Sequence, residues 1–277
     1  MNLDITSIGK IELTRLGDSS RKRKLLCLHG GPGMDPSYFF PYLNPLACDA
    51  ELIFYRQGCS GAVTIDALVD ELAQVVKFFQ GSEIFLFGHS FGGALALEYG
   101  KRFGLTDLAG LILVSWVYDD KWFARSLVKY SDFCNSLQLT QEAREKARLS
   151  KPSVNVKCRE SFLDFVPLYF TPKNHDLGQR IIANTEYNGE LFFSVMGGYL
   201  KNFDLLPFIQ TISIPTLSIL GKEDGVVSAE YIRAGLAGNC RMKQHEISNV
   251  SHFPFIEDTD QFISVVKAFV NNKGESP

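Results

Sequence analysis

The sequence lacks an apolar run long enough to cross a membrane. Its longest apolar stretch, residues 108–117, falls well short of the about 20 residues that a spanning helix needs. Its first residues also lack the basic segment and following apolar stretch that mark a secretory signal. We therefore expect a protein that neither contacts a membrane nor is exported.

Positive charge is not in excess, and the cysteines show no paired spacing. The chain of 277 residues has 28 Lys and Arg against 31 Asp and Glu, a net charge of −3. A protein that binds a phosphate backbone needs a basic face, so nucleic acid is not an expected partner. The six cysteines include no Cys-x-x-Cys pair, and the histidines include no His-x-x-x-His pair. We expect reduced thiols in a cytoplasmic protein with no metal and no cofactor.

What is present favours a folded α/β protein. With 45% hydrophobic and 12% aromatic residues, the chain can bury a large core. Short apolar runs alternate with segments of helical periodicity. We expect strands at 8–16, 24–28, 51–55, 83–87, 108–114, 215–220 and 241–247, and helices at 64–80, 91–103, 228–237 and 258–271. This alternation predicts a mostly parallel sheet flanked by helices on both faces.

The alternation stops in the middle of the chain. Residues 118–204 are rich in aromatic side chains, and the polar segment 140–150 is typical of an exposed helix. We expect 118–204 to be a helical cap insertion over one edge of a core formed by 1–117 and 205–277. The alternative is that this segment is simply more core.

The segment Gly88-His89-Ser90-Phe91-Gly92 lies between an expected strand and an expected helix. A turn this tight strains the backbone at Ser90, and glycines on either side leave room for it. The hydroxyl would stand at the carboxyl edge of the sheet, and the amide of Phe91, at the helix N-terminus, could stabilise an oxyanion. The alternative is that Ser90 is a plain helix N-cap.

A second glycine-rich segment, His29-Gly30-Gly31-Pro32-Gly33, follows the strand expected at 24–28. The glycines allow backbone amides to approach a ligand, so the Gly31 amide is a candidate second oxyanion donor. We expect His29 to hold the loop by hydrogen bonds rather than to act as a base. A Gly-Pro turn without chemistry is the alternative.

A serine nucleophile needs a base, and the base needs an orienting carboxylate. Among the five histidines, His252 lies in the loop between the last expected strand and the last expected helix, at the same sheet edge as Ser90. Asp224 follows the strand expected at 215–220 and is the candidate carboxylate, with Glu223 beside it as the residue most easily confused with it. A turn-forming aspartate would look the same.

These motifs together resemble the α/β-hydrolase superfamily over nearly the whole chain, and the order Ser90, Asp224, His252 is that of the superfamily. His-Gly-Gly-Pro-Gly resembles the proline iminopeptidase (prolyl aminopeptidase) branch, which removes an N-terminal proline and carries a helical cap. The resemblance implies that serine, acid and base map onto Ser90, Asp224 and His252, and the oxyanion hole onto Gly31 and Phe91.

The chain departs from that branch in two motifs. Residues 56–61 are Arg-Gln-Gly-Cys-Ser-Gly where the branch usually has Asp-Gln-Arg-Gly-x-Gly. Residues 88–92 are Gly-His-Ser-Phe-Gly, a form also common in esterases, where the branch often has Gly-Gly-Ser-Trp-Gly. The branch binds the substrate amine with cap glutamates. Thr185-Glu186-Tyr187-Asn188 resembles one such stretch, which makes Glu186 a candidate substrate-binding residue; a solvated surface glutamate is the alternative.

We expect a cofactor-independent serine hydrolase that acts through an acyl-enzyme on a small molecule or a short peptide. The resemblance favours an aminopeptidase that releases N-terminal proline, and a carboxylesterase acting on small esters is the alternative. A non-catalytic ligand-binding homologue is a third reading. An iminopeptidase needs buried negative charge to meet the amine, whereas an esterase does not, so the charge lining the pocket discriminates between the first two.

Overall fold

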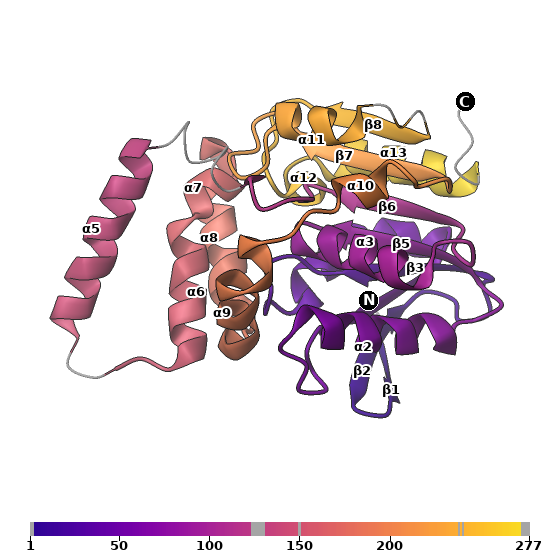
Figure 1. The fold of residues 1–277 in the computed structure, drawn as a ribbon, viewed down its shortest axis with the longest axis horizontal. Coiled ribbons are helices and arrows are strands. Elements are labelled where there is room, and N and C mark those ends of the chain that lie inside the picture. The colour runs from indigo at the N-terminus through magenta and orange to yellow at the C-terminus, as the bar shows by residue number, and fades with distance from the viewer. Residues whose placement is uncertain (1–2, 123–130, 149–150, 238, 240, 273–277) are drawn as a thin grey trace.

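The computed structural model describes residues 3–122, 131–148, 151–237, 239 and 241–272, and these residues form an eight-stranded sheet (Figure 1). The strand order is β1-β2-β4-β3-β5-β6-β7-β8. The strands are β1 (Asp4–Ile8), β2 (Ile11–Leu16), β3 (Arg23–Leu28), β4 (Glu51–Tyr55), β5 (Glu83–His89), β6 (Gly110–Val114), β7 (Thr216–Gly221) and β8 (Met242–Ile247). Strands β4 to β8 and β3 pair in parallel, while β1 and β2 are antiparallel. The expected fold class is confirmed.

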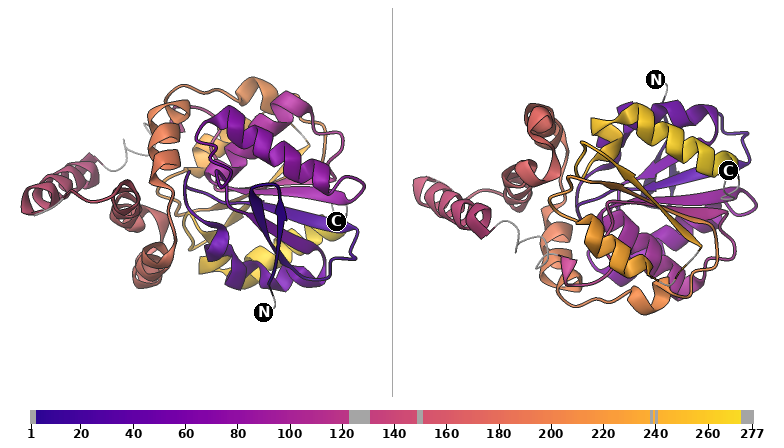
Figure 2. Two further views of the ribbon diagram at one scale, coloured as in Figure 1. Left: turned by 90° about the horizontal axis from the view of Figure 1, so that it is seen from below. Right: turned by 90° about the horizontal axis from the view of Figure 1, so that it is seen from above.

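Helices cover both faces of the sheet (Figure 2). One face is covered by α2 (Ile65–Phe78), α3 (Phe91–Phe103) and α11 (Ala229–Leu236). The other is covered by α1 (Phe40–Leu43), α12 (Pro254–Glu257), α13 (Thr259–Asn271) and the 3-10 turns η1 (Pro36–Phe39) and η2 (Asn44–Cys48). Because the central strands are buried on both sides, their sequences are continuous apolar runs rather than alternating ones.

The strand predicted over 8–16 is confirmed for 11–16, which form β2, but its start is wrong. The chain forms a hairpin there, in which Gly9 and Lys10 make the turn between β1 and β2. Gly9 has a φ of +58°, a conformation that glycine adopts at little cost and that two-residue hairpin turns require. The short helical turns η1, α1, η2 and α12 were not expected either, because each is too short to show a helical period.

The helices between β6 and β7 lie mostly at one end of the sheet, whereas the last of them, α10 (Leu206–Ile209), packs against α3 and α11 (Figure 1). They are α5 (Ser131–Ala147), α6 (Val154–Asp164), α7 (Val166–Tyr169), η3 (Pro172–Asn174), α8 (His175–Asn184), α9 (Gly189–Gly197), η4 (Tyr199–Lys201) and α10 (Leu206–Ile209). The chain leaves and returns at one place, since Asp119 and Asp204 form an antiparallel bridge and the Leu205 amide donates to the Tyr118 carbonyl at 2.8 Å. The helix expected at 140–150 is the second half of α5, and residues 149–150 lie outside the described residues. The division into a cap at 118–204 and a core stays a prediction.

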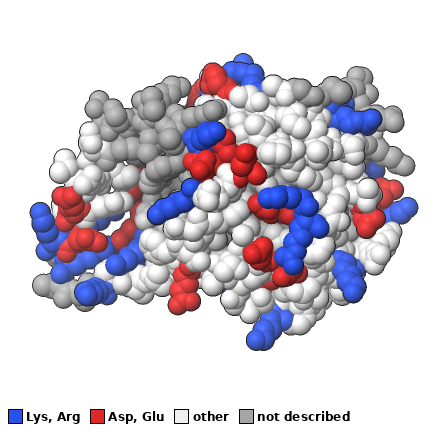
Figure 3. Space-filling view, in the orientation of Figure 1, with Lys and Arg blue, Asp and Glu red and all other residues white. Residues whose placement is uncertain are grey.

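Figure 3 shows positive and negative side chains interspersed over the face seen in Figure 1. No helix within the described part of the chain has the length and apolar character that crossing a bilayer requires.

Candidate active site

Ser90 occupies a strained turn between β5 and α3. Its φ and ψ are 52° and −118°, a conformation that side-chain-bearing residues rarely adopt. The turn is possible because its neighbours are glycines: a Cβ on Gly88 would lie 2.5 Å from the Gly92 oxygen, and one on Gly92 would lie 2.2 Å from the Leu28 oxygen. The Ser90 side chain makes no capping bond to α3, so the N-cap alternative is wrong.

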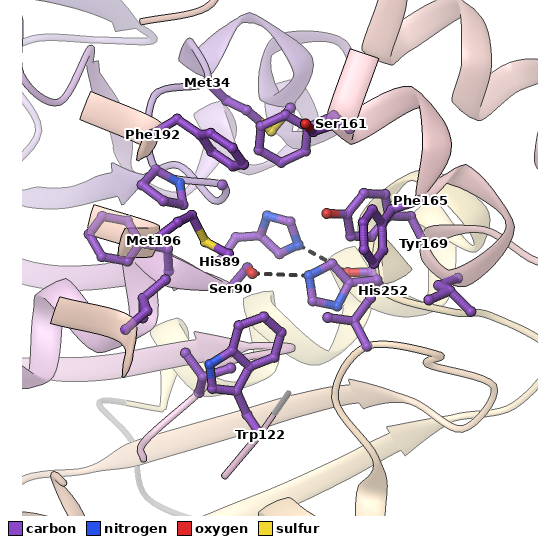
Figure 4. A pocket seen from close by; sticks show the side chains of 18 of the residues that line it. Met34, His89, Ser90, Trp122, Ser161, Phe165, Tyr169, Phe192, Met196 and His252 are labelled. Atoms are coloured by element: carbon purple, nitrogen blue, oxygen red, sulfur yellow. Dashed lines mark hydrogen bonds between the residues drawn. The ribbon is translucent and has the colours of Figure 1, made fainter. Parts of the chain in front are cut away.

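The structure brings Ser90, His252 and Asp224 together in one hydrogen-bonded line (Figure 4 shows its Ser90–His252 part). The distance from His252 Nε2 to Ser90 Oγ is 3.0 Å, and that from His252 Nδ1 to Asp224 Oδ2 is 2.9 Å. The side chains of His252 and Asp224 are 2% and 0% exposed. These residues follow β5, β7 and β8, which end at the same edge of the sheet.

The contacts of Asp224 determine how the proton of the imidazole is placed. Asp224 Oδ1 accepts hydrogen bonds from the amides of Val226 and Val227, both at 2.8 Å, so the carboxylate is held in one orientation. A carboxylate can only accept, so Nδ1 of His252 carries the hydrogen and Nε2 is left to accept the Ser90 proton. The neighbouring Glu223 is exposed and instead accepts from the Asn249 amide at 2.9 Å.

The two candidate oxyanion donors both line the cavity in front of Ser90. Phe91 is the first residue of α3, so no preceding helical turn supplies its amide with an acceptor. The Gly30 amide donates to Tyr38 Oη at 2.6 Å and is thus engaged, which leaves Gly31 as the donor from the glycine-rich loop. A Cβ on Gly31 would lie 2.5 Å from the Phe162 ring, so this position requires glycine.

His29 holds the glycine-rich loop, as its sequence position suggested. Its Nε2 accepts from the Gln57 amide at 3.0 Å, and its Nδ1 donates to the Gly30 carbonyl at 3.1 Å. Burial lowers the pKa of His29 to about 4. His29 is therefore neutral at pH 7 and is turned away from the cavity chemistry.

The cavity in front of Ser90 encloses about 860 Å³, including the part that opens to solvent. Most of its walls are apolar or aromatic, and they come from both the core and the helices between β6 and β7 (Figure 4). They include Met34, Val117, Trp122, Phe162, Phe165, Leu168, Tyr169, Phe192, Met196, Leu200 and Val226. None of the described side chains that line it is Asp, Glu, Lys or Arg. The high aromatic content of 118–204 was the sequence signal for this wall, but it could not say which aromatics face Ser90.

Tyr169 is the main polar group that sequence reasoning missed in this wall. Its hydroxyl points into the cavity (Figure 4), and its ring centroid lies 5.4 Å from that of His252. Burial raises the pKa of Tyr169, so the phenol stays protonated and is a neutral hydrogen-bond donor.

The structure does not bring Glu186 into the cavity, which corrects the expectation from the sequence. The Glu186 side chain is 72% exposed and pairs with Arg56 at 2.7 Å. Its amide donates to Asp35 Oδ2 at 2.6 Å, which fixes the backbone on the outer side of the glycine-rich loop. The solvated-glutamate alternative fits this placement.

Comparisons with known proteins agree with this architecture. A family model described as alpha/beta hydrolase family matches residues 25–265. The proline iminopeptidase of Saccharolobus solfataricus is 28% identical, with 90% of this chain and 85% of that protein aligned. That of Heyndrickxia coagulans is 25% identical over 98% of both chains.

Solved structures show the same fold. The proline iminopeptidase of Mycobacterium smegmatis superposes with a TM-score of 0.73 at 18% identity, covering 99% of each chain. An esterase of Exiguobacterium antarcticum gives a TM-score of 0.69 at 16% identity, covering 94% of this chain and 95% of that one. The expected α/β-hydrolase fold and the resemblance to proline iminopeptidases are confirmed.

Proposed function

Because the chain belongs to the alpha/beta hydrolase family, we propose that it is a serine hydrolase that needs no cofactor, with Ser90 as nucleophile, His252 as base and Asp224 as orienting carboxylate. The observation that carries the proposal is the unbroken line of hydrogen bonds from Asp224 through His252 to Ser90, next to a largely apolar cavity. A binding protein without catalysis has no need for a buried carboxylate and imidazole aligned on a strained serine.

The reaction follows from the proton positions. His252 Nε2 takes the proton of Ser90 as Oγ attacks the substrate carbonyl carbon, and the carbonyl oxygen becomes an oxyanion. The amides of Gly31 and Phe91 donate to that oxyanion, and each such donor contributes about 3 kcal/mol to the transition state. Asp224 stabilises the imidazolium.

Collapse of the tetrahedral intermediate breaks the bond to the leaving group. The leaving group takes the proton from His252 Nε2 and departs as an alcohol or amine, while the acyl group stays on Ser90 as an ester. Water then gives a proton to His252 and attacks that ester. The acid is released, and Ser90 regains its proton from His252.

We propose small esters with an apolar acyl group as the substrates. The described cavity walls offer aromatic and aliphatic contacts and no carboxylate. Burying a protonated amine without a charged partner costs several kcal/mol, whereas an uncharged acyl chain gains from the same walls.

The second candidate is an aminopeptidase that releases N-terminal proline. It is favoured by the curated relatives, which carry that name at 22–28% identity over at least 90% of this chain. Glu186 does not support it, because that side chain is paired with Arg56 at the surface.

The test compares p-nitrophenyl butyrate with proline p-nitroanilide on the purified protein. We expect kcat/KM for the ester to exceed that for the anilide by about a hundredfold, which corresponds to about 2.7 kcal/mol of transition-state binding. The reverse order, with activity lost when the proline nitrogen is acetylated, would establish the aminopeptidase.

Mass spectrometry after treatment with a fluorophosphonate then identifies the nucleophile. We expect one adduct on Ser90 in the wild type and none in Ser90→Ala. A wild-type chain that resists labelling and hydrolyses neither substrate would favour the ligand-binding reading.

A further inference from the structure

His89, the residue before Ser90, carries two hydrogen bonds that the reaction described above does not use. The residue is 1% exposed. Its Nε2 lies 3.0 Å from the main-chain oxygen of His252 (Figure 4), and its Nδ1 lies 3.0 Å from Tyr38 Oη. The side chain thus reaches the backbone of the base.

The direction of each bond follows from the chemistry of its ends. A carbonyl oxygen only accepts, so His89 Nε2 carries the hydrogen and donates to His252. Neutral imidazole then has a bare Nδ1, which accepts the single hydroxyl hydrogen of Tyr38. Tyr38 Oη in turn accepts from the Gly30 amide at 2.6 Å. All hydrogens in this Tyr38–His89 chain point the same way, from Gly30 towards His252.

The Tyr38–His89 chain joins the three segments that supply the chemistry. Gly30 precedes the oxyanion donor Gly31, His89 precedes Ser90, and the last acceptor belongs to His252 itself. The approach is close: a Cβ on Gly30 would lie 2.6 Å from His89 Nδ1 and 3.0 Å from Ser90 Cβ. The separation of these segments in sequence means that no local hydrogen bond could align them.

The surroundings of His89 keep its ring neutral, so the hydrogens of the Tyr38–His89 chain keep one direction. The rings of Phe253 and Phe255 lie 4.7 and 5.1 Å from the His89 ring, and Tyr38 is 4% exposed. Burial lowers the pKa of His89 well below the ordinary value, and the charge of a protonated His252 would lower it further. A protonated His89 would also have no lone pair for the Tyr38 hydrogen.

We propose that Tyr38 and His89 are positioning residues, which hold the oxyanion donor Gly31, the nucleophile Ser90 and the base His252 in register through this directed chain. The inference rests on the proposed function, because it concerns the same active site. Neither residue takes a proton from the substrate. Their effect is on where the Gly31 amide and the His252 ring stand when the oxyanion forms, since small displacements there reduce the rate strongly.

The first experiment is Tyr38→Phe, which removes one oxygen and keeps the ring. We expect kcat for p-nitrophenyl butyrate to fall 10- to 100-fold while KM changes less than about threefold, because the misplaced donor matters only once the oxyanion forms. Tyr42→Phe is the matched control: Tyr42 is a half-buried tyrosine on α1 outside this chain, and its variant should keep the wild-type kcat.

Variants of His89 test the chain from its other end. His89→Leu should lower kcat at least as much as Tyr38→Phe, and His89→Gln, which can still donate to the His252 carbonyl, should recover part of the loss. The double variant Tyr38→Phe with His89→Leu should be no worse than His89→Leu alone, because both changes break one chain.

Nitrogen-15 NMR gives a readout that does not depend on activity. In Ser90→Ala, which has no nucleophile, His89 should stay neutral with its hydrogen on Nε2, and its Nδ1 signal should move when Tyr38→Phe is added. The tautomer of His89 is read in Ser90→Ala alone, so it tests the proposal even if Tyr38→Phe folds poorly.

The outcomes separate the two proposals. A folded Tyr38→Phe variant with kcat within twofold of the wild type, or a His89 that carries its hydrogen on Nδ1, overturns the positioning role and leaves the serine hydrolase standing. A wild-type chain with no hydrolysis and no Ser90 adduct overturns both.

Discussion

The sheet and the helix α5 are held by different kinds of contact. Strands β4 and β6 are buried along their whole length between two helical layers. Helix α5 lies at the far end of the molecule from the sheet (Figure 1), and its described side chains are almost all exposed. Polar contacts connect it to α6, and they include Arg144 to Asp164 at 2.6 Å and the neighbouring pair of Arg148 with Glu160.

The residues of the candidate site also come from two parts of the molecule. The residues proposed for chemistry lie at the ends of strands or at the start of α3, where the surrounding core fixes their positions. The residues that shape the cavity, such as Phe162, Tyr169 and Phe192, come from the helices between β6 and β7. These wall helices are tied to the loop of the base, since the His252 amide donates to the Tyr169 carbonyl at 3.0 Å.

Glu257 on α12 connects the helices between β6 and β7 to the loop that carries His252. Its carboxylate accepts from the Thr171 amide and from Asn174 Nδ2, both at 2.8 Å, and also from the Ser251 amide. It thereby ties the segment after α7 to the residue before His252.

The largest effect on activity is expected from a change of Asp224, the carboxylate that orients His252. Asp224→Asn should lower kcat about ten-thousandfold, because the asparagine amide favours the wrong tautomer of His252. Ester hydrolysis measured beside the circular dichroism spectrum checks this. Glu223→Gln is the control, since that exposed neighbour does not touch His252; equal losses in both variants would contradict the assignment.

A large loss of stability is expected when a ring is removed from the sheet, and a small one when a ring is removed from the helices above it. Phe87→Ala, at a fully buried position of β5, should lower the free energy of unfolding by about 3–5 kcal/mol. Phe193→Ala, on α9 at a residue that is 42% exposed, should cost less than about 1 kcal/mol. Urea denaturation of the two variants measures the contrast, and similar midpoints would remove it.

We expect low pH to reduce the stability of the fold through the protonation of His29. The pKa of this buried histidine is about 4 in the folded protein, against an ordinary value near 6.5, so between these values the unfolded chain binds the additional proton. Stability is therefore complete above about pH 6.5 and is lost as the pH falls towards 4, by up to about 3 kcal/mol. His89, whose pKa is also lowered, acts in the same sense.

Urea denaturation at pH 7.5 and pH 5 tests this dependence, with His29→Gln as the comparison. The variant should be less stable at pH 7.5, and its decline towards pH 5 should be shallower. An equally steep decline would show that other groups cause the acid sensitivity.

The smallest effect is expected on α5. Arg144→Ala removes a partly exposed ion pair with Asp164 and should change the free energy of unfolding by less than about 1 kcal/mol. The difference from the wild type should shrink further in 1 M salt. A loss above about 2 kcal/mol would mean that α5 is as tightly held as the sheet.

Much of the fold and the site was open to prediction from the chain alone. Strands β3 to β7 are visible in the sequence as short runs rich in apolar residues, whereas β8 is mostly polar. Ser90, Asp224 and His252 each follow or adjoin a strand of the parallel series, so parallel pairing implies one shared edge. The hairpin at Gly9 was missed because its turn has only two residues and because β1 is a largely exposed strand with only two apolar side chains.

Residue type and order along the chain determined which groups are available and at which edge of the sheet they stand, because strand and helix periods are local properties. Tertiary structure alone decided their partners. Glu186 faces solvent because Arg56 and Asp35, which are far away in sequence, bind its side chain and its amide. His89 forms a hydrogen bond with Tyr38, which is 51 positions away in the sequence. The direction of a side chain and the charge of a cavity depend on which distant segments pack together, and no local pattern encodes that.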